Sequence, residues 1–273
     1  MDPRPIGVFD SGLGGLSAVR VLRRLLPSEP IVYLGDTARM PYGSRPAGEI
    51  DRLTGELTGW LLHQNVKALI AACGTISCNA GETLRRLPVP CFDVVTAAAI
   101  AAARATQNGK VGLAATAATV RSGRFAREIE TRTGQAVTAV PCPQLAPMIE
   151  SGMTPQEPAL VAAVAEYCRP FLQQGVDTVV LGCTHYPLAA EAFAKVLGPQ
   201  VTLIDCGGEA ARAAAEALGQ AHLLTEGTVP AAENYWFTAL PPQAARQTAF
   251  RLLGEEITPQ LLPPEELNAF STR

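Results

Sequence analysis

The sequence has little charge and few aromatic residues, and neither sign of charge dominates. Of its 273 residues, 17% are charged and 5% are aromatic, and 22 basic against 25 acidic residues give a net charge of −3. A chain without a basic surplus lacks the electrostatic footprint of a nucleic-acid-binding protein. We therefore expect no nucleic acid among its partners. With 48% hydrophobic residues, the composition also excludes a disordered chain and allows a large core.

Long hydrophobic runs are absent as well. The most apolar stretch, residues 94–103, is about half of a membrane span and stops at Arg104. The N-terminus shows no basic segment followed by an apolar stretch and a small-residue cleavage site. These absences predict a cytoplasmic protein without a signal peptide and without a membrane partner.

Neither a disulfide framework nor a metal site is indicated. The seven cysteines are odd in number, no C-x-x-C pair occurs, and the three histidines are scattered at positions 63, 185 and 222. The Walker sequence is missing too, and Gly12-x-Gly14-Gly15 is not the dinucleotide fingerprint. That glycine-rich turn is either a tight strand-to-helix turn or a site where helix-start amides bind a carboxylate. We expect no metal and no cofactor.

Short apolar runs alternate with helix-like segments from end to end. The predicted strands are residues 6–9, 31–34, 68–72, 91–94, 111–114, 137–140, 178–181 and 201–204. The predicted helices are residues 15–26, 47–63, one ending near 87, 97–105, 121–133, 158–173, 188–197 and 209–218. Continuous Val, Ile and Leu runs between helices are typical of strands buried on both faces, so the sequence predicts an α/β protein with parallel sheets.

Two segments suggest that the chain has two related halves. Residues 67–75 and 177–184 are each an apolar strand that ends in a cysteine, followed by small or hydroxyl residues, and they lie 110 positions apart. We place one domain at residues 1–95 plus 207–273 and the other at 96–206. The strand-like residues 235–237 then belong to a tail that packs back on the first half.

The cysteines at these two strand ends, Cys73 and Cys183, carry the chemical hypothesis. Most buried cysteines act as small hydrophobes, and we expect this of Cys78, Cys91, Cys142, Cys168 and Cys206. Ligands of parallel sheets bind at the carboxyl ends of strands, where Cys73 and Cys183 are placed. Two thiols on opposite sides of a carbon can remove a proton from one face and return one to the other, which is racemase or epimerase chemistry. His185 lies two residues after Cys183 and can favour a thiolate there.

Without a metal or pyridoxal, the carbanion formed at such a site has no electron sink. The substrate carboxylate must therefore be held by preorganised donors. Helix N-termini and the hydroxyls of Ser11, Thr75 and Thr184 are the candidates.

Six motifs in the same order resemble the glutamate racemases of bacterial cell-wall synthesis, from the cofactor-independent aspartate/glutamate racemase superfamily. They are residues 9–15 (FDSGLGG), 35–36 (GD), 41–43 (PYG), 73–75 (CGT), 150–152 (ESG) and 181–188 (LGCTHYPL). The resemblance runs from about Ile6 to Gly208. It implies two pseudo-symmetric α/β domains with the substrate in the cleft between them, and a homodimer.

The resemblance also assigns site residues. Cys73 would act on the Cα proton of D-glutamate and Cys183 on that of L-glutamate. Its assisting polar residues match Asp10, Glu150 and His185, and its substrate-binding positions match Asp10, Ser11, Tyr42, Gly43, Gly74, Thr75, Thr184 and His185.

The sequence departs from the family at Gly74. Glutamate racemases usually have Asn between the cysteine and the threonine, so one side-chain amide is missing here. We expect its space to be vacant or filled by water, in which case Gly74→Asn would lower KM for glutamate and leave kcat unchanged. A clash or a rebuilt pocket is the alternative.

Three other functions remain open besides glutamate racemisation. The first is a racemase for aspartate or another α-substituted acid. The second is a decarboxylase of the same superfamily, which needs only one thiol. The third is a binding protein that uses the cleft without turnover.

Overall fold

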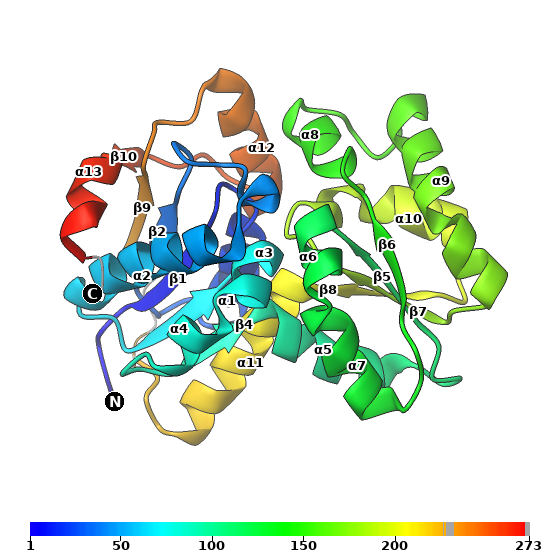
Figure 1. Ribbon diagram of the computed structural model, residues 1–273. Coiled ribbons are helices and arrows are strands. Elements are labelled where there is room, and N and C mark those ends of the chain that lie inside the picture. Colours follow the sequence, from blue (N-terminus) through cyan, green and yellow to red (C-terminus); the bar gives the residue numbers. More distant parts are fainter. Residues whose placement is uncertain (226, 228–231, 271–273) are drawn as a thin grey trace.

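A computed structural model describes residues 1–225, 227 and 232–270 and contains two sheets (Figure 1). The first has the strand order β10-β9-β2-β1-β3-β4 and the second β6-β5-β7-β8, with every pair parallel. The strands are β1 (Ile6–Asp10), β2 (Ile31–Gly35), β3 (Ala68–Ala71), β4 (Cys91–Asp93), β5 (Val111–Ala115), β6 (Thr138–Pro141), β7 (Thr178–Leu181), β8 (Thr202–Asp205), β9 (Glu233–Phe237) and β10 (Pro259–Leu261). The prediction of an α/β fold with two parallel sheets flanked by helices is confirmed.

Helices lie against both sheets (Figure 1). The α-helices are α1 (Leu16–Leu25), α2 (Ala47–His63), α3 (Gly74–Asn79), α4 (Gly81–Arg85), α5 (Val94–Ala105), α6 (Ala117–Ser122), α7 (Arg124–Thr133), α8 (Leu145–Glu150), α9 (Pro158–Gln174), α10 (Ala190–Leu197), α11 (Cys206–Gln220), α12 (Gln243–Leu253) and α13 (Pro264–Leu267). Short 3-10 helices are η1 (Tyr42–Ser44), η2 (Tyr186–Ala189) and η3 (Asn268–Phe270). No helix in the described part of the chain is long and apolar enough to span a membrane.

The four strands β2-β1-β3-β4 have the same order as β6-β5-β7-β8, so β3 and β7 occupy equivalent places. Every residue of β1, β3, β5 and β7 is buried, which explains their uninterrupted apolar sequences. Cys73 and Cys183 therefore follow equivalent strands. The two cysteine segments that look alike in sequence occupy matching positions in the two sheets.

The two sheets are joined through α5 and α11, which pack on each other. Both helices are rich in alanine and bury small residues, among them Ala98, Ala102, Ala210 and Ala214. Small side chains let two helix backbones approach closely. One hydrophobic cluster accordingly continues from β1 through these helices to β5 and β7. The exact division into domains at Val95 and Cys206 stays a prediction.

Several boundaries differ from the predicted ones for local reasons. The strand predicted for residues 91–94 ends at Asp93, and α5 begins at Val94, because the Asp93 carboxylate accepts hydrogen bonds from the amides of Val95 and Thr96 at 2.9 Å. The helix predicted for residues 121–133 is two helices separated by Gly123, whose φ of 65° is left-handed.

The C-terminal segment packs on the first sheet. The predicted strand at residues 235–237 lies in β9, which pairs with β2, and β10 extends the sheet by one more strand. Neither β10 nor α12 was predicted from the sequence. Helix α12 contacts both α1 and α8, so it lies beside the line where the two halves meet (Figure 1).

Candidate active site

A cavity of about 360 Å³ opens where the carboxyl ends of the two sheets face each other. It is lined by all eleven residues that the sequence singled out: Asp10, Ser11, Tyr42, Gly43, Cys73, Gly74, Thr75, Glu150, Cys183, Thr184 and His185. Residues scattered over 175 positions of sequence thus meet in one place because strand ends of parallel sheets converge. Their individual roles stay predictions.

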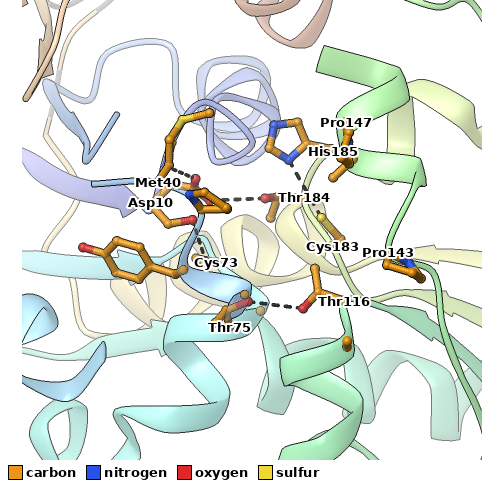
Figure 2. A pocket seen from close by; sticks show the side chains of 18 of the residues that line it. Asp10, Met40, Cys73, Thr75, Thr116, Pro143, Pro147, Cys183, Thr184 and His185 are labelled. Carbon is orange, nitrogen blue, oxygen red and sulfur yellow. Dashed lines mark hydrogen bonds between the residues drawn. The ribbon is translucent and has the colours of Figure 1, made fainter. Parts of the chain in front are cut away.

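The two thiols come from opposite walls of this cavity (Figure 2). Cys73 is the N-cap residue of α3, just after β3, and is 6% exposed. Cys183 follows β7 and is 8% exposed. Both are free thiols that line the cavity and are almost completely buried. Such a pair can address the two faces of one carbon atom.

Cys73 is surrounded by groups that favour its protonated form. Burial, with the nearby Asp10 carboxylate, raises the pKa of Cys73 to about 12, although the hydroxyl of Ser11 partly opposes this shift. The Ser11 Oγ lies 3.4 Å from the Cys73 Sγ. At neutral pH Cys73 is therefore a thiol, a form that can donate a proton.

Cys183 has a different neighbour, the imidazole of His185. The Nδ1 of His185 lies 3.8 Å from the Cys183 Sγ, and its Nε2 lies 3.0 Å from Oε1 of Glu150, close enough for an ion pair but without a well-aligned hydrogen bond. Burial lowers the pKa of His185, but Cys183 and Glu150 outweigh it and hold this pKa well above its ordinary value. The Cys183 sulfur and the His185 ring are therefore placed for proton exchange between them.

Hydrogen bonds across the cavity tie the two halves together. The Thr184 hydroxyl donates to Oδ2 of Asp10 at 3.2 Å, and the hydroxyls of Thr75 and Thr116 lie 3.3 Å apart (Figure 2). Thr116 follows β5 and lines the cavity, but it was not among the predicted site residues. The rule that ligands bind at strand ends would have found it, because the strand itself was predicted. Cys142, expected to be a buried structural cysteine, is 1% exposed and also lines the cavity.

Asp10 is a buried carboxylate with few compensating partners. Its Oδ1 accepts the amide of Gly12 at 2.6 Å, and the residue is 1% exposed. Burial raises the pKa of Asp10 from 3.8 to about 6, although the charge of His185 partly offsets the effect. Above pH 6 the buried Asp10 carboxyl is therefore ionised, and this buried charge lowers the free energy of unfolding. Below about pH 4 the carboxyl is protonated in both the folded and unfolded states, and this cost is gone.

We expect Asp10→Asn to stabilise the protein at pH 8 by up to about 3 kcal/mol, since each pH unit between the two pKa values is worth about 1.4 kcal/mol. The amide can still accept from Gly12 and can donate to the Thr184 hydroxyl. The gain should shrink as pH falls from 6 and vanish below about pH 4. Urea unfolding of both proteins at several pH values measures it. A gain that does not change with pH would show that charge burial is not its cause.

Tyr42 forms another wall of the cavity through a buried network. Its hydroxyl donates to the carboxylate of Asp36, and burial together with that carboxylate raises the pKa of Tyr42 above its ordinary value. Asp36 is fully buried and also accepts from Arg39 and Thr238, each at 2.7 Å. This network fixes the tyrosine ring and the start of η1, which carries Gly43.

The expectation of vacant space at Gly74 is wrong. A Cβ on Gly74 would lie less than 3.0 Å from the backbone carbonyl oxygen of Gly182, closer than real Cβ atoms come, and 3.5 Å from the Thr119 Oγ1. A backbone carbonyl cannot rotate away as a flexible side chain can. Gly74, the first residue of α3, therefore lies directly against the backbone of Gly182, which follows β7, and both residues line the cavity.

The cavity offers acid–base groups but no metal cluster. Within residues 1–225, 227 and 232–270, no three His, Cys, Asp or Glu side chains are grouped so that they could hold an ion. The chemistry that these residues can supply is proton transfer by thiols, backed by two carboxylates and one imidazole.

Comparisons with known proteins agree with this geometry. Residues 15–214 match the family model described as Asp/Glu/Hydantoin racemase. A glutamate racemase of Streptococcus suis is 40% identical over 259 residues, which cover 94% of this chain and 97% of the relative. One from Neisseria meningitidis is 38% identical over 255 residues, 92% of each chain.

Solved structures give the same result. The glutamate racemase of Francisella tularensis, crystallised with D-glutamate, superposes with a TM-score of 0.90 at 33% identity, covering 98% of this chain and all of the other. The enzyme of Thermus thermophilus, in complex with β-chloro-D-alanine, has a TM-score of 0.85 at 39% identity and covers 97% of this chain and all of the other. The chain is therefore an isomerase that belongs to the glutamate racemases of the Asp/Glu/Hydantoin racemase family.

Proposed function

We propose that this protein interconverts L-glutamate and D-glutamate by a two-thiol acid–base mechanism that needs no cofactor. The observation that carries the proposal is the pair of buried thiols, Cys73 and Cys183, on opposite walls of one cavity (Figure 2). Their neighbours differ, since Asp10 favours the thiol form of Cys73, whereas the His185 Nδ1 lies 3.8 Å from the Cys183 Sγ and can exchange a proton with it. In the proposed mechanism one cysteine acts as the acid while the other acts as the base.

With L-glutamate bound, the Cys183 thiolate removes the Cα proton and becomes a thiol. The planar carbanion then takes the proton of the Cys73 thiol on its opposite face, which gives D-glutamate and leaves Cys73 as a thiolate. From D-glutamate the same steps run in reverse, starting from the Cys73 thiolate and the Cys183 thiol. Proton exchange with solvent restores the starting protonation states after each turnover. Glu150 keeps His185 charged, and Asp10 supports the acid form of Cys73.

Neutral donors hold the substrate. The described lining of the cavity includes no lysine or arginine. We assign the substrate carboxylates to the hydroxyls of Ser11, Thr75 and Thr184 and to backbone amides of the segments 42–43, 74–75 and 184–185. Preorganised donors of this kind stabilise the charge that develops on a carboxylate when Cα loses its proton. Asp10 and Glu150 are the carboxylates that suit the cationic amino group.

Membership of the glutamate racemase family supports a proposal for the biological setting. We propose that the protein acts in the cytoplasm as a homodimer and supplies D-glutamate for peptidoglycan synthesis. No metal or organic cofactor enters the reaction, so the rate should be the same before and after dialysis against a chelator.

Incubation of the purified protein with L-glutamate, with D-glutamate and with both enantiomers of aspartate tests the function. We expect the circular dichroism of either glutamate enantiomer to decay to zero, which marks a racemic mixture. Aspartate, one methylene shorter, should react about 10- to 200-fold less efficiently. Faster turnover of aspartate would favour the sister racemase, carbon dioxide release a decarboxylase, and binding without any loss of optical activity a non-catalytic protein.

A further inference from the structure

Helix α12, which belongs to the C-terminal segment of the first half, is hydrogen-bonded to the second half. The Arg251 Nη2 donates to the carbonyl oxygen of Met153 at 2.7 Å, and the Thr248 hydroxyl donates to the carbonyl oxygen of Glu150 at 3.3 Å. Figure 1 shows α12 and α8 facing each other across the line where the two halves meet. Thr248 is fully buried in this contact.

The Glu150 carbonyl is the last one of α8, and the Met153 carbonyl lies three residues further on, in the turn that follows the helix. The last carbonyls of a helix have no partner within the helix and need donors from elsewhere. Gly152 adopts a left-handed φ of 98° and turns the chain directly after the helix, so that Met153 follows in a tight return. Arg251 and Thr248 together hold this turn, and the turn carries Glu150.

The Glu150 side chain depends on that support. It is 30% exposed, and its Oε1 reaches His185 at 3.0 Å without a well-aligned hydrogen bond. A partly exposed carboxylate on a short helix is placed mainly by its backbone. A shift of the α8 terminus would move the Glu150 carboxylate away from His185 and remove one of the groups that raise the pKa of this ring.

We propose that Arg251, assisted by Thr248, is a positioning residue for the acid–base machinery: it fixes the end of α8 and thereby keeps Glu150 against His185. The assignment of a catalytic task to His185 rests on the proposed function. The positioning itself does not, because it concerns the protein without substrate. The titratable groups that face His185 are Cys183, Glu150 and Asp10.

The direct test is an NMR titration of the histidine Cε1 protons, for which the chain offers only three residues, His63, His185 and His222. Arg251→Met removes the donor and keeps the apolar stem. Arg246→Met is the matched control, because Arg246 lies on the same helix but donates to Pro241 within its own segment. We expect Arg251→Met to lower the pKa of His185 and to leave His63 and His222 unchanged, whereas Arg246→Met changes none of them.

Kinetics give the second readout. Arg251→Met should reduce kcat about tenfold with little change in KM, equally in both directions because the enantiomers have equal free energy. The alkaline limb of the pH profile of kcat should move to lower pH, because the His185 imidazolium with a lower pKa loses its proton at lower pH. Combined with Glu150→Gln, Arg251→Met should have no additional effect, because the side chain that it positions is already altered.

Thr248→Val and Thr248→Ser form a second pair, which keeps the test decisive if Arg251→Met does not fold. Only the valine variant should lower the pKa of His185. Three results would each overturn the positioning role. The first is an unchanged pKa of His185 in folded Arg251→Met or in Thr248→Val. The others are equal effects of Arg246→Met and Arg251→Met, and full additivity of Arg251→Met with Glu150→Gln. A wild-type protein that fails to racemise glutamate would contradict the proposed function alone, because the NMR titration needs no turnover.

Discussion

Replacement of either Cys73 or Cys183 by alanine should abolish racemisation while leaving the fold intact. A planar carbanion must be reprotonated from the face opposite the departing proton, so one remaining thiol cannot complete the reaction. General acid–base groups contribute about 10²- to 10⁴-fold to rates, and we expect a loss at the upper end of that range. Each change removes only one small buried atom, and the thermal unfolding temperature should move by a few degrees at most.

Each single variant should still exchange one proton. Cys73→Ala keeps Cys183 and should exchange the Cα proton of L-glutamate with solvent. Cys183→Ala keeps Cys73 and should do the same with D-glutamate, but more slowly, because the raised pKa of Cys73 leaves little thiolate. Cys168→Ala is the control, because Cys168 is fully buried in the core of the second half away from the cavity lining. Near-normal racemisation by either active-site variant would remove that cysteine from the mechanism.

Gly74→Asn should reduce kcat/KM for glutamate strongly, by about a hundredfold or more, although it restores the residue that glutamate racemases usually have. The new Cβ would collide with the carbonyl of Gly182, the residue before Cys183, so the two walls must separate. A misplacement of about 1 Å between reacting groups costs on the order of 10²-fold in rate. Gly74→Ala should show most of the same loss, because the first carbon causes the clash.

Gly48→Ala serves as the control for Gly74. It lies in the first turn of α2, and an added Cβ there meets nothing within 4 Å. Steady-state kinetics with both glutamate enantiomers compare the three variants. A lower KM with unchanged kcat in Gly74→Asn would show that the Gly74–Gly182 contact opens at no cost and that the amide has been accommodated.

The sequence predicted those parts of the fold that depend on local patterns. Buried parallel strands such as β1, β3, β5 and β7 are continuous apolar runs, and the polar residues directly after them converge by the geometry of parallel sheets. This explains why the eight predicted site residues at the ends of β1, β3 and β7 line one cavity, whereas Tyr42 and Gly43 reach it from η1 and Glu150 from the end of α8. Thr116 follows β5 in the same way but was not among the predicted residues.

Contacts between segments that lie far apart in the sequence could not be predicted from such local patterns. Nothing near Gly74 in the sequence indicates that Gly182 lies against it, so vacant space was a reasonable but incorrect expectation. Likewise, the amphipathic α12 has no sequence feature that reveals the acceptors of Arg251 and Thr248 at the end of α8. Helices α5 and α11 begin three residues earlier than predicted, because the carboxylates of Asp93 and Asp205 cap their first amides.

The central claim is that two thiols act on opposite faces of Cα, each on one enantiomer. Solvent deuterium incorporation tests it most directly. In heavy water, L-glutamate is allowed to react to a few per cent conversion, and the two enantiomers are separated and analysed by mass spectrometry. The account predicts that the D-glutamate formed carries deuterium at Cα while the recovered L-glutamate remains almost unlabelled, and that the converse holds from D-glutamate. Equal labelling of product and recovered substrate from the first turnovers would contradict it.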